Sequence, residues 1–230
     1  MEIDLSEYVA GGYFVVKYSD HGFEPSELLP QRLISISNCI GRKLEIYWGW
    51  DTNQNRQDIL DFGIPEEKFS AFETWSTSAS NIGFPGVFYT LDAAREFIAT
   101  FLATVQDIVL IGIGLPNEMV DDFIVDNPQT VYDPATQMHL QDLYGINYVL
   151  HQKNQLASEG QAIGFEVVGE NFGLSCSWLC SGLEKVMHDL FGIHPNSYGL
   201  IDSYEDAKKS GLPKMRCKGL AANRNRIIPG

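Results

Sequence analysis

Four acidic residues follow an apolar run at spacings typical of one helix face. They are Glu118, Asp121, Asp122 and Asp126. Carboxylates crowded in this way have the oxygen atoms that a divalent cation prefers, although a solvated helix face is the more common explanation. The same face is also suited to docking a basic protein, because fixed charges steer a cationic partner. We therefore take these four residues as candidates for partner binding.

Aromatic residues supply the other candidates. Trp48 and Trp50 end a predicted strand, and Asp51 begins a polar turn directly after them. Trp178 lies opposite the apolar side of a predicted helix, where it either packs against the rest of the protein or faces a partner. Large aromatic side chains anchor interfaces, but they also build cores. The set predicted to bind a partner therefore adds Trp48, Trp50, Asp51 and Trp178 to the four acids.

The cysteines favour packing over metal binding. Cys176, Cys180, Glu184 and His188 follow one another at intervals of four, which suits ligands on one helix. On a helical wheel, however, Glu184 and His188 lie off the apolar face, whereas both cysteines lie on it. The apolar face also carries Leu179, Leu183, Val186, Met187 and Leu190, so core packing is favoured over a metal site. A structural zinc site needs four converging ligands. We predict reduced, buried cysteines and no metal, and four cysteines are too few for a disulfide framework in 230 residues.

Motifs of known enzyme classes are missing from the sequence. It holds no G-x-S-x-G, no H-E-x-x-H, no phosphate-binding Walker loop and no kinase signature. Gly112-Ile113-Gly114 lacks the third glycine of a dinucleotide loop. We expect no catalytic residue and no cofactor. The alternative is an enzyme or small-ligand binder with a cleft between two lobes, in which His139, His151 and His194 would serve acid–base chemistry.

Charge is distributed unevenly along this acidic chain. The net charge is −14, yet no acidic residue follows Asp206, and seven of the 16 basic residues do. No lysine or arginine occurs from Glu96 to Gln152. Such a body repels nucleic acids and anionic membranes and attracts basic proteins. The plainer explanation is that the charge serves solubility.

Length and hydropathy limit where the protein works. The longest apolar run, Ile108 to Leu115, is far shorter than the roughly 20 residues of a membrane span. The acidic N-terminal sequence has no basic segment ahead of an apolar one, so it does not resemble a secretory signal. We expect no membrane association and a cytoplasmic address.

Hydrophobic periodicity predicts an α+β fold. Thr90 is a good N-cap for a helix over Leu91 to Val105, and the run Asp107 to Leu115, which is uncharged after its first residue, indicates a central strand buried on both faces. The polar residues His151 to Gln161 are the best linker candidate. Further strands are expected over Tyr13 to Tyr18, Leu33 to Ile40, Leu44 to Trp50, Val87 to Tyr89, Gly164 to Gly169 and Gly199 to Ile201. Further helices are expected over Asn53 to Asp61, Glu66 to Trp75, Pro116 to Asp126, Ser177 to Phe191 and Tyr204 to Lys209.

Two segments of the chain align without gaps. Gly86 to Glu96 matches Gly199 to Lys209, with Thr90 opposite Ser203 as helix caps, and a Phe-Gly-Ile helix stop precedes each copy. The alternative is that capping chemistry makes such junctions look alike. The alignment predicts two similar strand-helix-strand-helix lobes packed together, over residues 1–152 and 161–230, which also count as one compact domain if they share a core.

The run GFEVVGE, SCSWLCSGLEKV and FGIHPNSYGLIDSYEDA, within Gly164 to Ala207, resembles small acidic bacterial immunity proteins that neutralise secreted toxins. It covers less than a quarter of the chain. The resemblance implies a non-catalytic protein that binds a basic toxin domain, and it assigns no role to a single residue. The remaining alternative is a structural subunit of a homo-oligomer, such as a homodimer with the aromatic residues at its interface.

Overall fold

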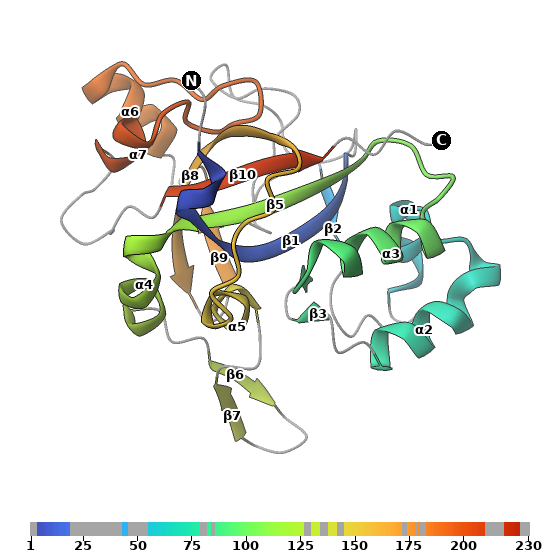
Figure 1. Ribbon diagram of the computed structural model, residues 1–230. Helices are drawn as coiled ribbons and strands as arrows, with labels where there is room; N and C mark the ends of the chain where they lie inside the picture. Colours follow the sequence, from blue (N-terminus) through green and yellow to red (C-terminus); the bar gives the residue numbers. More distant parts are fainter. Residues whose placement is uncertain are drawn as a thin grey trace.

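The computed structural model describes residues 4–18, 43–45, 55–78, 82–83, 86–126, 130–133, 138–141, 145–171, 174–177, 179, 183–209 and 219–225. An eight-stranded sheet forms the centre of the α+β fold (Figure 1). The strand order is β3-β4-β1-β5-β10-β8-β9, with β2 also paired to β1, and each pairing is antiparallel. The strands are β1 (Tyr8–Tyr18), β2 (Lys43–Glu45), β3 (Ile82–Gly83), β4 (Val87–Phe88), β5 (Ile108–Pro116), β8 (Gln161–Asn171), β9 (Leu174–Ser177) and β10 (Gly219–Asn225). A separate hairpin joins β6 (Thr130–Asp133) to β7 (Met138–Gln141).

β5 lies in the middle of this sheet, as its uncharged sequence predicts. It pairs with β1 from Tyr8↔Pro116 to Lys17↔Ile108 and with β10 on its other edge. Its residues from Val109 to Pro116 are all buried, so both faces are covered. The face that carries Ile113 packs on Ile146 of α5 (Gly145–His151), across Gly11 of β1. This run is therefore confirmed as a buried central strand.

The predicted linker covers the other face of β5. Ala10 N donates to Asn154 O at 2.8 Å, and Leu156 N donates to Tyr8 O at 3.0 Å, so the segment is docked along β1. Leu156 is buried, and it lies over Gly112 and Gly114, which have no side chains to obstruct it. A Cβ atom at Gly114 would lie 2.7 Å from Leu156 Cδ2. The two glycines thus belong inside a strand and make room for Leu156, and they form no phosphate-binding loop.

The helices of the first half form an aromatic layer beside β4. Gly63, at φ 114°, ends α1 (Arg56–Phe62), which confirms the Phe-Gly-Ile stop. The 3₁₀ turn Glu66–Lys68 and α2 (Phe69–Ser78) follow, then α3 (Leu91–Phe101). Phe72 and Trp75 of α2 stack at 6.0 Å and contact Phe97 and Phe101 of α3, so the aromatic face of α2 packs into the core. Phe88 of β4 contacts Trp75 and Phe97, so α2, α3 and β4 form one packed unit.

The chain beyond β8 holds α6 (Leu183–Phe191) and α7 (Tyr204–Lys209). Met187 of α6 is buried and so is Leu179 before it, but the helix's Leu190 is 65% exposed and its Val186 38%. The helical wheel was therefore wrong to place Val186 and Leu190 in the core, since this short helix contacts the body along a narrower stripe. Cys39, Cys176, Cys180 and Cys217 have no described side chains, so their predicted state remains a prediction.

Both predicted caps form. Thr90 Oγ1 accepts a hydrogen bond from Ala93 N at 3.2 Å, and Ser203 Oγ accepts one from Asp206 N at 3.1 Å. The duplication remains a hypothesis, because Ile201 makes a single isolated bridge to Phe165 instead of a strand. One sheet also contains strands from both predicted lobes, because β10 lies between β5 and β8. The strand predicted over Leu33 to Ile40 lies outside the described residues.

Candidate functional site

The predicted acidic helix is built as two short pieces. β5 ends at Pro116, the 3₁₀ turn η3 (Asn117–Met119) follows, and α4 (Val120–Asp126) completes the segment. Pro116 therefore ends the strand and precedes the turn, instead of lying in a helix that runs from Pro116. Glu118 belongs to η3, whereas Asp121 and Asp122 lie in the first turn of α4. Carboxylates at this end favour the helix, because its exposed amide groups carry partial positive charge.

α4 has one buried and one exposed side. Val120 is 2% exposed and Phe123 0%, and the helix also contacts α5. On the outer side, Asp121 and Asp122 are exposed, and Val125 is 77% exposed. Because Asp121 and Val125 are four residues apart, they are neighbours on the helix surface. We call Glu118, Asp121 and Asp122 the acidic face, and Val125 is an apolar side chain at its edge.

A lysine from the next segment already contacts this face. Lys153 Nζ lies 2.9 Å from Asp121 Oδ1, with both side chains mostly exposed. Lys153 holds a left-handed backbone conformation, with φ 51°, in the turn after α5. It is the first lysine or arginine after the interval from Glu96 to Gln152, which contains neither. Exposed pairs of this kind contribute about 0–1 kcal/mol, so the lysine compensates charge more than it stabilises the fold.

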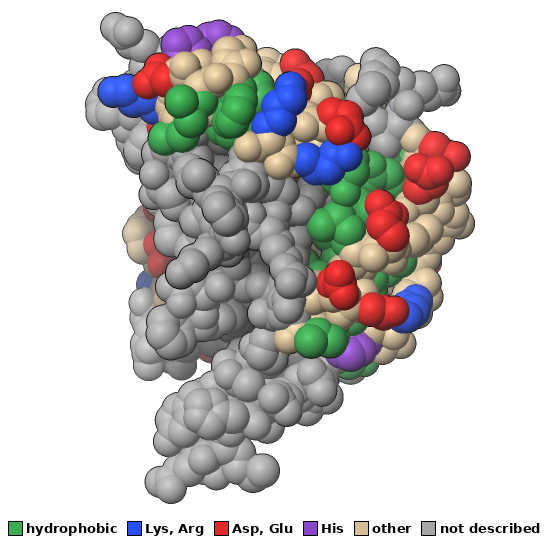
Figure 2. Space-filling model, turned by 90° about the vertical axis from the view of Figure 1, so that its left-hand side faces the viewer, with side chains coloured by type: hydrophobic (Ala, Val, Ile, Leu, Met, Phe, Trp, Pro, Cys, Tyr) green, Lys and Arg blue, Asp and Glu red, His purple; other side chains and the backbone are tan. Residues whose placement is uncertain are grey.

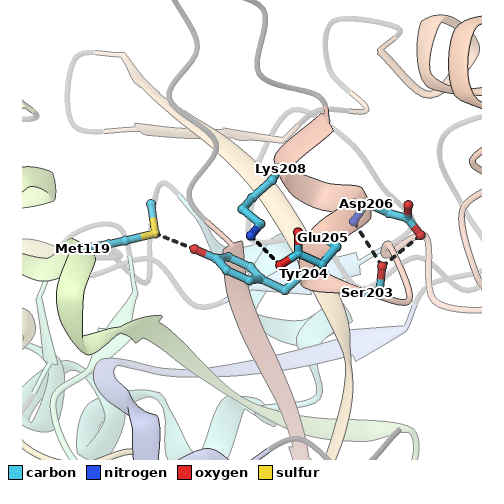
Figure 3. A network of polar contacts seen from close by, with 6 residues as sticks. All are labelled: Met119, Ser203, Tyr204, Glu205, Asp206 and Lys208. Atoms are coloured by element: carbon cyan, nitrogen blue, oxygen red, sulfur yellow. Dashed lines mark hydrogen bonds and ion pairs between the residues drawn. The ribbon is translucent and has the colours of Figure 1, made fainter.

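α7 borders the acidic face on its other side (Figure 3). Tyr204 Oη donates a hydrogen bond to Met119 Sδ at 3.0 Å, which joins α7 to η3. Lys208 Nζ lies 4.7 Å from the Tyr204 ring centroid and is paired with Glu205. The bond to Glu205 raises the pKa of Lys208 above its ordinary value, so this ammonium group stays charged. Lys208 is thus paired with Glu205 and is also influenced by the charge of Glu118 in the acidic face.

Tyr8, at the start of β1, lies beneath this border. Its side chain is buried, and burial, followed by the influence of Tyr204, Glu7 and Glu118, raises the pKa of Tyr8. The phenol of Tyr8 therefore stays neutral next to these acidic groups. Figure 2 shows this side of the molecule, on which acidic side chains gather on the right around an apolar area. The surface combines fixed negative charge with an apolar component, which is the composition of a protein-binding site more than of a reaction centre.

The other candidates have different outcomes. Trp48, Trp50, Asp51 and Trp178 lie outside the described residues, and Asp126 ends α4 without a described side chain. Their roles stay predictions. Lys153, Val125 and the Tyr204–Met119 contact were missed by sequence reasoning. The sequence did hold a signal for Lys153, because it is the first lysine or arginine after the interval from Glu96 to Gln152. Nothing in the sequence indicates that Tyr204 contacts Met119.

The histidines and a surface pocket bear on the alternative of an enzyme or small-ligand binder. Within it, no three His, Cys, Asp or Glu side chains gather as metal ligands. His151 ends α5 and His194 follows α6, and in Figure 1 α6 lies at the upper left of the ribbon and α5 well below it, so the two histidines come from different regions. An open surface pocket lies between the N-terminal 3₁₀ turn η1 (Leu5–Glu7) and the segment from Gln155 to Ala162. Among the described residues that line this pocket, Asp4 is the one with an ionisable side chain.

Comparison with known proteins adds no relative. No family model, curated protein or solved structure matches this chain. Among the described residues, no helix is both long and apolar enough to cross a membrane. The acidic face and its surroundings are therefore the features of the molecule that bear on its function.

Proposed function

We propose that this chain is a non-catalytic binding protein of the immunity type, which holds a basic toxin domain against its acidic face and blocks it. The observation that carries the proposal is the two-sided construction of α4. Val120 and Phe123 fix the helix to the core, while Asp121, Asp122 and Val125 face outwards. A fixed set of charges loses little conformational freedom when a partner binds, so more of the interaction energy remains as affinity.

Charge and shape together suit a basic protein. The carboxylates would steer a cationic partner and raise its association rate, because the net charge of −14 acts over the whole surface. Val125 would supply an apolar contact within the polar rim, as interfaces commonly do. The resemblance of residues 164–207 to toxin-immunity proteins points in the same direction, because those proteins work by binding. A cytoplasmic address and a lack of nucleic-acid or membrane partners belong to the same proposal.

A capture experiment from the native cell tests the proposal. The bait is the full chain, and the matched variants are Asp121→Asn/Asp122→Asn and Asp58→Asn/Glu67→Gln, which each remove two exposed charges. We expect the wild-type and Asp58→Asn/Glu67→Gln baits to retain a basic protein whose activity falls on binding, and the Asp121→Asn/Asp122→Asn bait to lose most of it. Equal capture by all three baits would contradict the proposed face. Sedimentation of the purified chain separates a homodimer from this complex.

A further inference from the structure

Two histidines at the end of α6 lie against each other on the surface. The ring centroids of His188 and His194 are 4.5 Å apart, with an angle of 62° between their planes. His188 lies in the last turn of α6, and both side chains reach solvent. Figure 2 shows histidine side chains gathered at the top of this face of the molecule, where α6 lies. In the sequence, His188 follows Cys176, Cys180 and Glu184 at intervals of four, whereas in the fold it lies against His194.

The turn after α6 holds the two rings together. Gly192, with φ 66°, ends the helix in the left-handed conformation, and its N–H donates to His188 O at 2.9 Å. Ile193 N then donates to Met187 O at 3.2 Å, and the Ile193 side chain is buried. The chain is thereby folded back on the helix end, which brings His194 over His188. The pair is positioned by backbone bonds and by a buried anchor, so it is preorganised in the free protein.

The hydrogen bonding of His188 suits a metal ligand. Its Nδ1 lies 3.0 Å from Asp189 Oδ1. A carboxylate at one ring nitrogen fixes the tautomer and the orientation of the ring and leaves Nε2 for a metal ion, which is the usual arrangement around metal-bound histidines. Zn–N bonds measure about 2.0–2.1 Å, so two imidazoles on neighbouring positions of one ion have centroids roughly 4.5–5 Å apart. The observed separation falls in this range.

We propose that His188 and His194 form a surface site for one divalent transition-metal ion of the Zn²⁺ class, with water at its remaining positions. Asp189 is a positioning residue that acts through His188. Imidazole nitrogens select zinc, copper or nickel over magnesium and calcium, which prefer oxygen ligands. The site is on α6, away from the acidic face, so it stands or falls independently of the proposed function.

Calorimetric titration of the full chain with Zn²⁺ tests the site, with excess Mg²⁺ present to occupy carboxylates. We expect one Zn²⁺ per chain, and at least a tenfold loss of affinity in each of His188→Gln and His194→Gln, since each removes half of the protein ligands. His151→Gln is the matched control, because it removes another exposed histidine from a helix end, and it should bind as the wild type does. Asp189→Asn should weaken binding less than either histidine variant.

Ring resonances provide a second measurement. On adding Zn²⁺, the side-chain nitrogen signals of His188 and His194 should shift together, and that of His151 should stay in place. Undetectable Zn²⁺ binding by the wild type, or unchanged affinity in both His188→Gln and His194→Gln, would overturn the proposal. Thermal unfolding of each variant without metal shows whether the variant is folded. If a histidine variant does not fold, the shift of the His188 and His194 signals in the wild type decides the question.

Discussion

Lys153 and Asp121 form an ion pair of 2.9 Å between the turn after α5 and the first turn of α4. The first lysine to follow a long acidic interval thus returns to neutralise one carboxylate of the acidic face. It occupies a position in which a cationic group of a partner would also be stable. We infer that a basic partner competes with Lys153 for Asp121.

Removal of Lys153 should therefore improve binding of a cationic probe. With a synthetic lysine-rich peptide at low salt, Lys153→Gln is expected to raise affinity about twofold to fivefold, in line with the free energy of an exposed pair. The matched control, Lys68→Gln, removes one positive charge from the 3₁₀ turn before α2 and should change affinity less. Fluorescence anisotropy measures both, and an equal rise in the two variants would mean that net charge alone is responsible.

The contact between Leu156 and Gly114 should appear as an energetic coupling. Gly114→Ala overpacks the site and should cost about 1–3 kcal/mol, and Leu156→Ala leaves a cavity and should cost about 2–5 kcal/mol. The double variant should be destabilised by less than the two costs together, because the smaller side chain makes room for the new methyl group. Urea unfolding provides the three free energies. Strict additivity would show that Leu156 does not lie on Gly114.

The N-terminal cap of α7 predicts a pH dependence of stability. Hydrogen bonds from Lys209 first, and then from Ser203, hold the pKa of Asp206 below its ordinary value of 3.8. The unfolded chain therefore binds the proton more readily, so this contribution is present above that value and is lost as pH falls through the native pKa. Asp206→Asn should make the unfolding free energy less dependent on pH on the acid side. Asp58→Asn is the control, and identical acid profiles of Asp206→Asn and the wild type would contradict this role.

Val125 should matter for the partner and not for the fold. Because its side chain is 77% exposed, Val125→Ser is expected to change the free energy of unfolding by no more than about 0.5 kcal/mol. On the proposed function, it should weaken the captured complex several-fold by faster dissociation. Val186→Ser on α6 is the matched control. Surface plasmon resonance measures the dissociation rates, and equal rates for Val125→Ser and the wild type would remove Val125 from the interface.

Sequence patterns predicted the elements that local chemistry decides. The Thr90 and Ser203 caps, the Gly63 helix stop and the buried strand β5 follow from hydrogen bonding and hydrophobic periodicity over a few residues. The docking of the segment around Leu156 was not predictable, because its partners on β1 and β5 are distant in the sequence. Polar composition made this segment look like a linker, although a single buried leucine fixes its course.

Prediction of the candidate site from the sequence was also limited to features that a few neighbouring residues decide. The exposure of Asp121 and Asp122 could be predicted from the sequence, because it follows from residue type and helical spacing. Pairs such as Lys153 with Asp121, Tyr204 with Met119 and His188 with His194 depend on how turns place side chains. Leu190 shows the same limit for apolar residues. Its helical spacing predicts a buried position, but the spacing does not show whether another element covers that side of the helix, and Leu190 is exposed.

The salt dependence of association tests whether the acidic face steers a basic partner. The rate constant for binding of the captured basic partner is measured by stopped flow over a series of salt concentrations, for the wild type, Asp121→Asn/Asp122→Asn and Asp58→Asn/Glu67→Gln. Exposed charges are screened beyond about 8–10 Å at physiological ionic strength, so steering by the acidic face makes the wild-type rate fall as salt rises. Steering by the acidic face predicts a slower rate and a shallower salt dependence for Asp121→Asn/Asp122→Asn than for the other two proteins. Identical rates and slopes in all three would contradict it.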